Sequence, residues 1–274
     1  MSAPIVDGLY AGIPDEVYHA DRDSLSSSGA RTLLFDSPNE FRNAPRVEKP
    51  EYDFGHAAHL YVLGEGSRIE VVDAPTWQTK DAKQARAAAY EAGRVPLLAK
   101  EDAKAREMAK VALGHDLVGA YFAEGEPELS GWWTDPEYGV RLRLRADWIT
   151  RLPDSRVIVV DYKTSKSSGY RAFAKAAGDY GYYMQQPFYL DGLRALEMEP
   201  ADFVFVSQSK TKPYRLTVAR VDHRDIAFGH ELNRRAVELF AKCMATDEWP
   251  DDSHLIHTVT VPSYIRYRAE EFLS

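Results

Sequence analysis

The segment RVIVVDYKTS (156–165) constrains the fold more than any other, because an apolar run leads directly into charged residues. The β-branched residues at 157–160 predict a central strand that is buried on both faces. Since side chains alternate along a strand, Asp161 and Lys163 should point to the same face. Burying a carboxylate and an ammonium is costly unless they have partners. The pattern therefore indicates either a salt bridge where the strand emerges or a catalytic pair.

The segment GVRLRLRADWI (139–149) predicts a second strand with two unlike faces. The apolar face has Val140, Leu142, Leu144, Ala146 and Trp148, and the charged face has Arg141, Arg143, Arg145 and Asp147. A turn at 152–156 should make this strand antiparallel to 157–163, which would bring Asp147 near Asp161. The charged face is either a solvated surface or a basic strip that binds phosphate beside a metal-binding Asp147.

Two carboxylates and a lysine suit the hydrolysis of a phosphodiester. Carboxylate oxygens are ligands that magnesium prefers. Such an ion lowers the pKa of a bound water and offsets charge on the phosphate, while a lysine orients that water or neutralises developing charge. We therefore expect Asp147, Asp161 and Lys163 to form a catalytic centre.

The remaining sequence predicts an α/β core with one mixed sheet flanked by helices and a helical N-terminal portion. In the N-terminal portion we expect a helix over 24–36 with a serine N-cap, a helix over 52–64 that ends at Gly64, and two helices over 81–124 that are parted near 93–96. Further along the chain we expect helical structure over 169–197, where Pro187 starts or kinks a helix, and a helix from Asp222 to about Trp249. Further strands are expected over 129–135, 202–209 and 214–221. We expect a single domain over 1–274, with a mainly helical part (1–124), a catalytic core (125–250) and a tail (251–274) of ambiguous structure.

Composition excludes several classes of protein. With one cysteine, Cys243, the chain cannot hold an internal disulfide or a metal site built from several thiolates. No window approaches the roughly 18–20 apolar residues of a membrane span, and the N-terminus lacks a signal-peptide pattern, so we expect a cytoplasmic protein. The net charge of −8 counts against a protein that simply coats DNA, but it allows a local basic channel with bound metal ions.

Two pairs of residues have helical spacing. Gly55 and His59 are four residues apart, as are Gln185 and Tyr189, so each pair can share one helix face. Taken alone, His59 fits a partly buried helix histidine, and Gln185 and Tyr189 fit an ordinary amphipathic helix.

Together with the aspartates and Lys163, these pairs resemble a known pattern. D-x(n)-D-x-K on adjacent strands is the core of the PD-(D/E)xK nucleases, and G-x-x-x-H and Q-x-x-x-Y are motifs of their RecB-like branch. The series runs over 55–189, and the flanking segments SLSSSGARTLL, SPNEFRN and FVFVSQ extend the resemblance over most of the chain. The chain is most similar to the RecE-like exonucleases, which include the exonuclease VIII C-terminal domain and its phage relatives.

The resemblance implies a restriction-endonuclease-like core with two magnesium ions. One ion would be held by His59, Asp147, Asp161 and the Tyr162 carbonyl. A second would share Asp147 or Asp161, with Glu128 as a further ligand, and manganese is an alternative metal. Glu126 and Glu124 compete with Glu128 for this role, and a solvated glutamate is an equal alternative.

The resemblance also implies roles for Gln185 and Tyr189. Gln185 would bond to substrate or to the surroundings of Lys163, and Tyr189 would contact the DNA backbone. Pro187 inside this motif is a departure from the pattern that leaves the helix start open.

RecE-like enzymes degrade one strand of linear duplex DNA from its 5′ end and leave a 3′ overhang. The implied partners are double-stranded DNA ends, a single-strand annealing protein and further copies in a ring, in the cytoplasm of a bacterial host if the chain is phage-encoded. The residues expected to contact DNA are Arg141, Arg143, Arg145 and Arg31. Ser26, Ser28 and Arg31 are candidates for a 5′-phosphate pocket, although the serines also fit simple helix caps.

Two other interpretations stay open. One is a CRISPR-associated RecB-like nuclease, many of which use four cysteines for an iron–sulfur cluster that this chain cannot build. The other is a DNA-binding module that keeps the nuclease fold without catalysis.

Overall fold

The computed structural model describes residues 2–45, 50–152, 154–167, 169–270 and 272–273. Its centre is a seven-stranded mixed sheet with the order β1-β5-β6-β7-β8-β9, to which β2 adds by pairing with β6. The strands are β1 (Gly8–Tyr10), β2 (Ser24–Leu25), β5 (Glu126–Thr134), β6 (Arg141–Arg151), β7 (Val157–Ser165), β8 (Pro200–Ser209) and β9 (Leu216–Ala219). The pairs β7–β8 and β2–β6 are parallel and the others antiparallel, which confirms the predicted mixed sheet.

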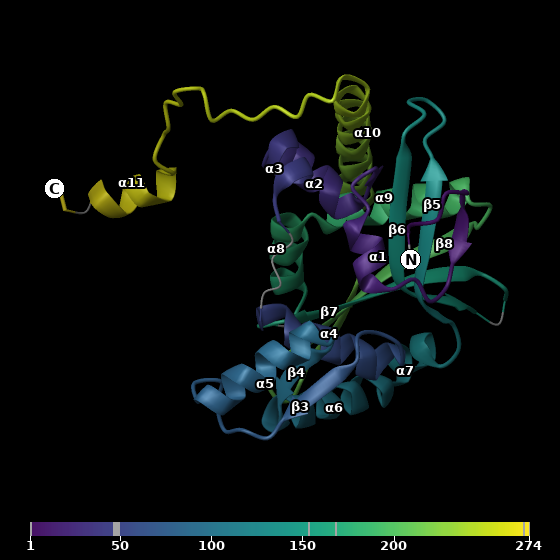
Figure 1. Cartoon of the computed structure of the whole chain (residues 1–274), viewed down its shortest axis with the longest axis vertical. Coiled ribbons are helices and arrows are strands. Elements are labelled where there is room, and N and C mark those ends of the chain that lie inside the picture. Colours follow the sequence, from purple (N-terminus) through teal and green to yellow (C-terminus); the bar gives the residue numbers. More distant parts are fainter. Residues whose placement is uncertain (1, 46–49, 153, 168, 271, 274) are drawn as a thin grey trace.

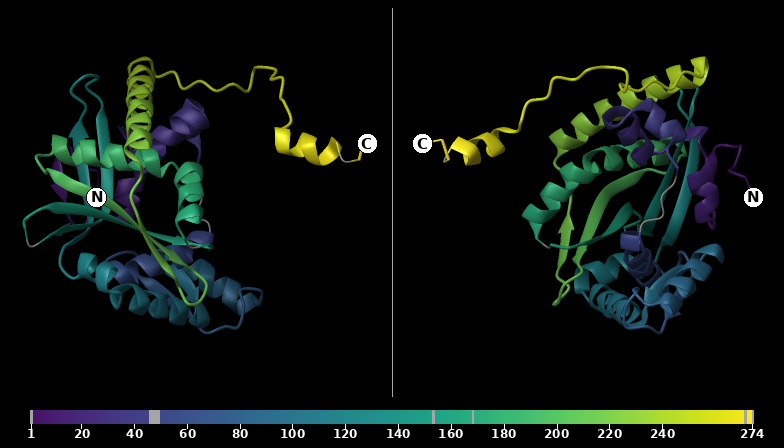
Figure 2. Two further views of the ribbon diagram at one scale, coloured as in Figure 1. Left: turned by 180° about the vertical axis from the view of Figure 1, so that it is seen from behind. Right: turned by 60° about the vertical axis from the view of Figure 1, so that its left-hand side comes forward.

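Helices cover both faces of this sheet (Figures 1 and 2). One face packs on α2 (Ser27–Phe35), α3 (Pro38–Asn43), α9 (Tyr182–Ala195) and α10 (His223–Thr246). The other packs on α4 (Pro50–Leu63), α6 (Ala99–Leu113) and α7 (Asp116–Phe122). Residues of β7 alternate between the two cores, with Val159 in the first and Val160 in the second, so the prediction of a central strand buried on both faces is confirmed.

The N-terminal portion differs from the prediction in its short strands. A separate parallel pair, β3 (Ile69–Val72) and β4 (Val95–Leu98), lies beside α5 (Lys80–Glu91). The expected two helices over 81–124 are therefore α5, α6 and α7, separated by β4 and by Gly114-His115. The VPLL run of β4 is buried at all four positions, so tertiary burial decides its conformation. The remaining short helix at the N-terminus is α1 (Asp15–Ala20).

The helical segment 169–197 is divided at Gly181, whose φ of 73° ends α8 (Tyr170–Tyr180) and begins α9. Pro187 lies inside α9 and cannot donate to the Tyr183 carbonyl. Helix α10 packs against this position. A Cβ added to Gly229 would lie 1.9 Å from the Tyr183 carbonyl oxygen, and the Asn233 amide donates to the Met184 carbonyl at 2.8 Å. The α9–α10 contact thus depends on backbone groups near the proline.

Beyond α10 the chain leaves the body as an extended arm that carries α11 (Ser263–Glu270), as Figures 1 and 2 show. Every described residue from 252 onward is exposed. In the described part of the chain, no helix combines the length and the apolarity needed to cross a membrane.

Candidate active site

Five elements bring the predicted polar residues together beside the point where β6 and β7 stop pairing. Strand β5 carries Glu128 and β6 carries Asp147. Strand β7 carries Asp161 and Lys163. Helix α4 supplies His59 from one face of the sheet, and α9 supplies Gln185 from the other. The antiparallel β6–β7 pairing follows the predicted turn at 152–156.

His59, Glu128 and Asp147 form the group best placed to hold a metal ion. One ligand atom from each lies within 4.8 Å of the others, and no other group of three such side chains occurs among the described residues. His59 Nδ1 lies 3.7 Å from Asp147 Oδ2, and the same oxygen accepts the Tyr162 backbone N–H at 2.9 Å. An imidazole and two carboxylates are a donor set that fits a divalent cation.

Asp161 is engaged differently. Its Oδ1 lies 2.7 Å from Lys163 Nζ, and its Oδ2 accepts from Gln185 Nε2 at 2.6 Å. The side chain of Asp161 is almost fully buried, and that of Lys163 is 23% exposed. The prediction that Asp161 and Lys163 share a strand face is confirmed. Gln185 fixes the orientation of the Asp161 carboxylate by donating to its second oxygen.

Burial perturbs the titration of these groups. It raises the pKa of Glu128 to about 8, with the Asp147 carboxylate acting in the same direction. It also raises the pKa of Asp161 to about 6, against the opposing effect of Lys163. For His59, burial and then the Lys163 ammonium lower the pKa to about 4, so the imidazole is neutral and able to bind a cation at pH 7.

The backbone of Glu128 has a φ of 49°, a left-handed conformation that is rare for a residue without a glycine's freedom. Such conformations cost about 1–3 kcal/mol and gather at functional sites. The neighbouring Glu124 and Glu126 are exposed, and neither joins His59 and Asp147. Of the three glutamates considered from sequence, the structure brings Glu128 into the cluster.

The arginines of β6 share one face but have partners within the chain. Arg141 donates to the Ile5 and Pro4 carbonyls, and Arg143 donates to the Ser24 carbonyl and, at 2.8 Å, to its hydroxyl. Arg145 forms an ion pair with Asp15 at 2.6 Å and lies 3.9 Å from Glu128. N-terminal residues therefore cover much of the predicted basic strip. Asp15 was not singled out from sequence, because no local pattern shows a partner 130 positions away.

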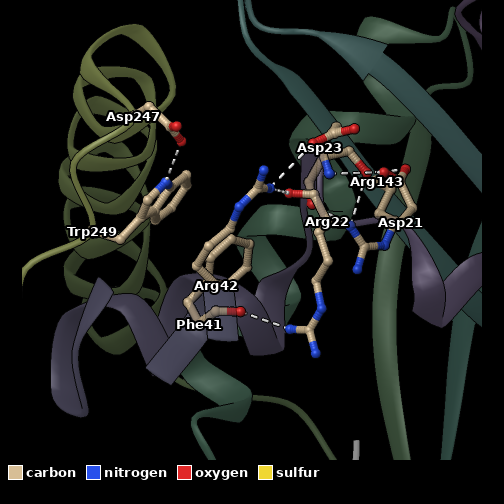
Figure 3. Close-up of polar contacts among 9 residues, drawn as sticks. Asp21, Arg22, Asp23, Phe41, Arg42, Arg143, Asp247 and Trp249 are labelled. Carbon is tan, nitrogen blue, oxygen red and sulfur yellow. Dashed lines mark hydrogen bonds and ion pairs between the residues drawn. The ribbon is translucent and has the colours of Figure 1, made fainter. Parts of the chain in front are cut away.

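Arg143 also lines a cavity of about 250 Å³ at the start of α2. Ser26, Ser28 and Arg22 share this cavity, and Glu40 and His19 also line it. Ser26 caps α2 by accepting the Gly29 N–H at 3.1 Å. Figure 3 shows Arg22 reaching the Phe41 carbonyl, with Arg143 beside Asp21. Arg31 lies elsewhere and donates to the Asp179 carbonyl at 2.9 Å.

Two tyrosines of α9 lie near the Asp161–Lys163 pair. Tyr189 is half-buried against the ring of Phe203, and burial raises its pKa well above the ordinary value. Lys163 Nζ lies 5.4 Å from the centre of the Tyr182 ring. Tyr182 was not identified as a site residue from the sequence. The only indication in the sequence is that Tyr182 lies three residues before Gln185.

A larger cavity of about 360 Å³ lies between α9, α10 and the β5–β6 hairpin. It is lined by residues such as Trp133, Phe188 and Arg234, and by none of the candidate metal ligands. The candidate metal ligands therefore lie outside the lining of this cavity, beside the point where β6 and β7 stop pairing.

Comparisons with known proteins agree with this architecture. A solved structure from Eubacterium rectale, described as a "putative exonuclease", matches over 92% of this chain and 96% of its own, with a TM-score of 0.60 and 13% identity. A phage-related exonuclease from Haemophilus somnus 129PT matches over 82% and 96% of the two chains at 10% identity, with a TM-score of only 0.34. No curated protein matches the sequence.

The first of these likenesses shows a shared fold. A family model described as a PDDEXK-like domain of unknown function (DUF3799) matches residues 39–260, which include every candidate metal ligand. The chain therefore belongs to the PDDEXK-like DUF3799 family.

Proposed function

We propose that the protein is a metal-dependent DNA exonuclease that degrades linear duplex DNA from the 5′ end and leaves 3′ overhangs for strand annealing. The observation that carries the proposal is the convergence of the His59, Glu128 and Asp147 cluster with the Asp161–Lys163 pair. The family match and the fold shared with a structure described as a "putative exonuclease" support the same reaction class.

The donor set fits magnesium through its carboxylates and also accepts manganese through its imidazole. A divalent ion held by His59, Glu128 and Asp147 would lower the pKa of an attacking water and offset charge on the scissile phosphate. Asp161 and the Tyr162 carbonyl are candidates for further ligands, and a second ion fits the same proposal.

The chain's own groups prepare this site. The carboxylates Asp161 and Asp147 raise the pKa of Lys163 against the lowering effect of burial, so the ammonium stays charged beside the reaction centre. There it can orient water or neutralise negative charge on the phosphate. Gln185 holds the second oxygen of Asp161 and so limits its rotation.

The cavity at α2 supports the proposed 5′ polarity. A helix start, two serine hydroxyls and the guanidiniums of Arg22 and Arg143 suit a terminal phosphate. In this proposal the cavity holds the 5′ end while the metal centre cuts the strand. A ring of copies would add processivity, and a single-strand annealing protein would take the overhang.

Cleavage of end-labelled DNA tests the proposal. Linear duplex labelled at the 5′ or the 3′ end, with closed circular duplex as the control, would be incubated with Mg²⁺, Mn²⁺ or EDTA. We expect metal-dependent loss of the 5′ label first and no cutting of circles. Cutting of circles would show an endonuclease, and DNA binding without metal-stimulated cleavage would show a binding module.

Substitution of the catalytic pair tests the assigned residues. We expect Asp161→Asn and Lys163→Ala to reduce cleavage by at least about 10²-fold without lowering the folded fraction. Exposed residues give the matched controls Asp154→Asn and Lys175→Ala, which should keep wild-type rates. Normal activity in either active-site variant would exclude the proposed centre.

A further inference from the structure

Two lysines meet at one aromatic ring near the start of the helix that carries His59, and a third lysine lies close to one of them. Lys104 of α6 and Lys210, which follows β8, place their Nζ atoms 5.0 and 5.3 Å from the centre of the Phe54 ring. Lys166 follows β7 and lies close enough to affect the pKa of Lys210. We call Lys104, Lys166, Lys210 and Phe54 the lysine cluster.

Within the part of the chain that the structure describes, the ammonium groups of this cluster form no ion pair. Among the described residues, no carboxylate lies within ion-pair distance of Lys104, Lys166 or Lys210. Other lysines do have such partners, for example Lys212 with Glu107 at 2.8 Å. The chain has 42 acidic and 34 basic residues, so three neighbouring lysines that form no ion pair with a described carboxylate are a distinct feature.

Two described acidic residues that neighbour cluster members in sequence, Asp102 and Asp53, bond to other side chains. Asp102 bonds to Tyr61 and Arg106, and Asp53 bonds to the Tyr90 hydroxyl at 2.6 Å. Burial lowers the pKa of Lys210, and Lys104 and Lys166 lower it further, so the three cations repel one another. An anion placed among them would relieve that repulsion.

The cluster adjoins the proposed reaction centre. Phe54 directly precedes Gly55, and His59 lies about one turn further along α4. A Cβ added to Gly55 would lie 3.8 Å from Thr164 Oγ1, so α4 starts close to the end of β7. The Lys210 backbone N–H donates to the Ser165 carbonyl at 2.8 Å, which joins the ends of β7 and β8. Lys166 follows Lys163 by three positions.

We propose that Lys104, Lys166 and Lys210 form a binding site for backbone phosphates of the DNA strand that flanks the scissile phosphate. This site rests on the proposed function. Its ligand class follows from chemistry. Three neighbouring lysines that form no ion pair with a described carboxylate suit a polyanion, and two of them directly follow the parallel strands β7 and β8. The path of that strand runs from the metal cluster over the start of α4, toward the region where α6 lies below β7 in Figure 1.

DNA binding at several salt concentrations tests this site. The full chain carrying Asp161→Asn would be titrated with a fluorescent linear duplex, with and without Lys104→Gln, Lys166→Gln and Lys210→Gln combined. We expect affinity to fall at least about 10-fold near 0.1 M salt. The slope of log K against log salt should become shallower by about 2.7 if all three lysines contact phosphates, since each phosphate contact contributes about 0.9.

A triple variant with the same change of charge is the control. Lys83, Lys175 and Lys242 are exposed on α5, α8 and α10, and their replacement by glutamine should change affinity by less than about 2-fold. Equal losses in both triple variants would reduce the effect to net charge and overturn the proposal. Thermal melting checks folding, and the single change of exposed Lys166 gives a smaller loss of the same kind if the triple variant unfolds.

Two further outcomes separate this site from the proposed function. If the wild-type chain binds DNA through these lysines but never cleaves it, the function fails and the site stands. If the chain cleaves DNA and the lysine variant keeps wild-type affinity and KM, the site fails and the function stands. A third outcome is that the lysine variant loses binding of a 5′-mononucleotide but keeps its affinity for duplex DNA. That result would show that the cluster binds the reaction product, and it would overturn the proposal.

Discussion

At the scale of single residues, strand alternation was a good guide to Asp161 and Lys163, which lie 2.7 Å apart as a pair on one face. Strand alternation could not show which of Glu124, Glu126 and Glu128 joins the candidate metal site. That outcome depends on the backbone of Glu128, whose φ of 49° no sequence pattern predicts. Alternation also placed the β6 arginines on one face without showing that residues 4–24 would cover them.

The pKa values of the site predict how stability depends on pH. The folded pKa of Glu128, about 8, exceeds its ordinary value of 4.5, so the folded state binds more protons than the unfolded state in this range. Below about pH 6.5 the raised pKa of Asp161 makes stability fall as pH rises, whereas the lowered pKa of His59 makes stability increase with pH, so the two effects oppose each other. Between pH 6.5 and 8, Glu128 dominates, and stability should fall as pH rises.

Thermal unfolding with EDTA or Mg²⁺ measures this effect. We expect the metal-free Tm to fall by on the order of 2–4 °C from pH 6.5 to 8, and Mg²⁺ to stabilise more at pH 8 because the ion competes with protons. Glu128→Gln should remove the decline, whereas Glu126→Gln, at an exposed position on the same strand, should keep it. A decline that persists in Glu128→Gln would assign it to another group.

At the scale of elements, the long strands and helices were predictable because their apolar periodicity extends over many residues. The short strands β1 to β4 were not, since two to four residues carry too little pattern and depend on partners far along the chain. The effect of Pro187 was also hidden. Because Pro187 has no N–H, the Tyr183 carbonyl receives no helix hydrogen bond from it, and Gly229 of α10 packs against that carbonyl. This contact helps to position α9, the helix that carries Gln185.

Gly229→Ala tests that helix contact. The added methyl group would meet the Tyr183 carbonyl at 1.9 Å, so α9 and α10 must separate, at a cost of about 1–3 kcal/mol. Both Tm and cleavage rate should fall, because Gln185 moves away from Asp161. Gly178→Ala on α8 has no neighbour within 4 Å and should instead stabilise by about 0.5–1 kcal/mol. An unchanged Tm in Gly229→Ala would contradict the close approach.

At the scale of the whole molecule, the order of the long elements was predictable from local patterns, whereas the roles expected for His59, Glu128 and Gln185 came from the family resemblance. The lysine cluster could not be found in this way, since its members come from α4, α6 and the ends of two strands. Such groupings appear only when distant segments are brought together.

The arm beyond α10 gives a prediction about stability. Deleting 252–274 should change Tm by less than about 1 °C, because the described residues removed are exposed. A deletion from Glu248 onward should lower Tm, because Trp249 stacks on Phe41 at 5.8 Å and contacts Phe240. A similar Tm for both truncations would contradict this account. Light scattering on the shorter chains would also show whether the predicted ring depends on the arm.

The parallel pairing of β7 with β8 bears on when the protein becomes active during synthesis. The connection between these strands is the α8–α9 segment, so the central strand gains its second neighbour only after residue 209 has been made. His59 leaves the ribosome long before Asp161, Lys163 and Gln185 exist to join it. A nascent chain that ends before β8 therefore lacks the strand that flanks β7 on its far side, so we expect the candidate centre to become ordered only after residue 209 has been made.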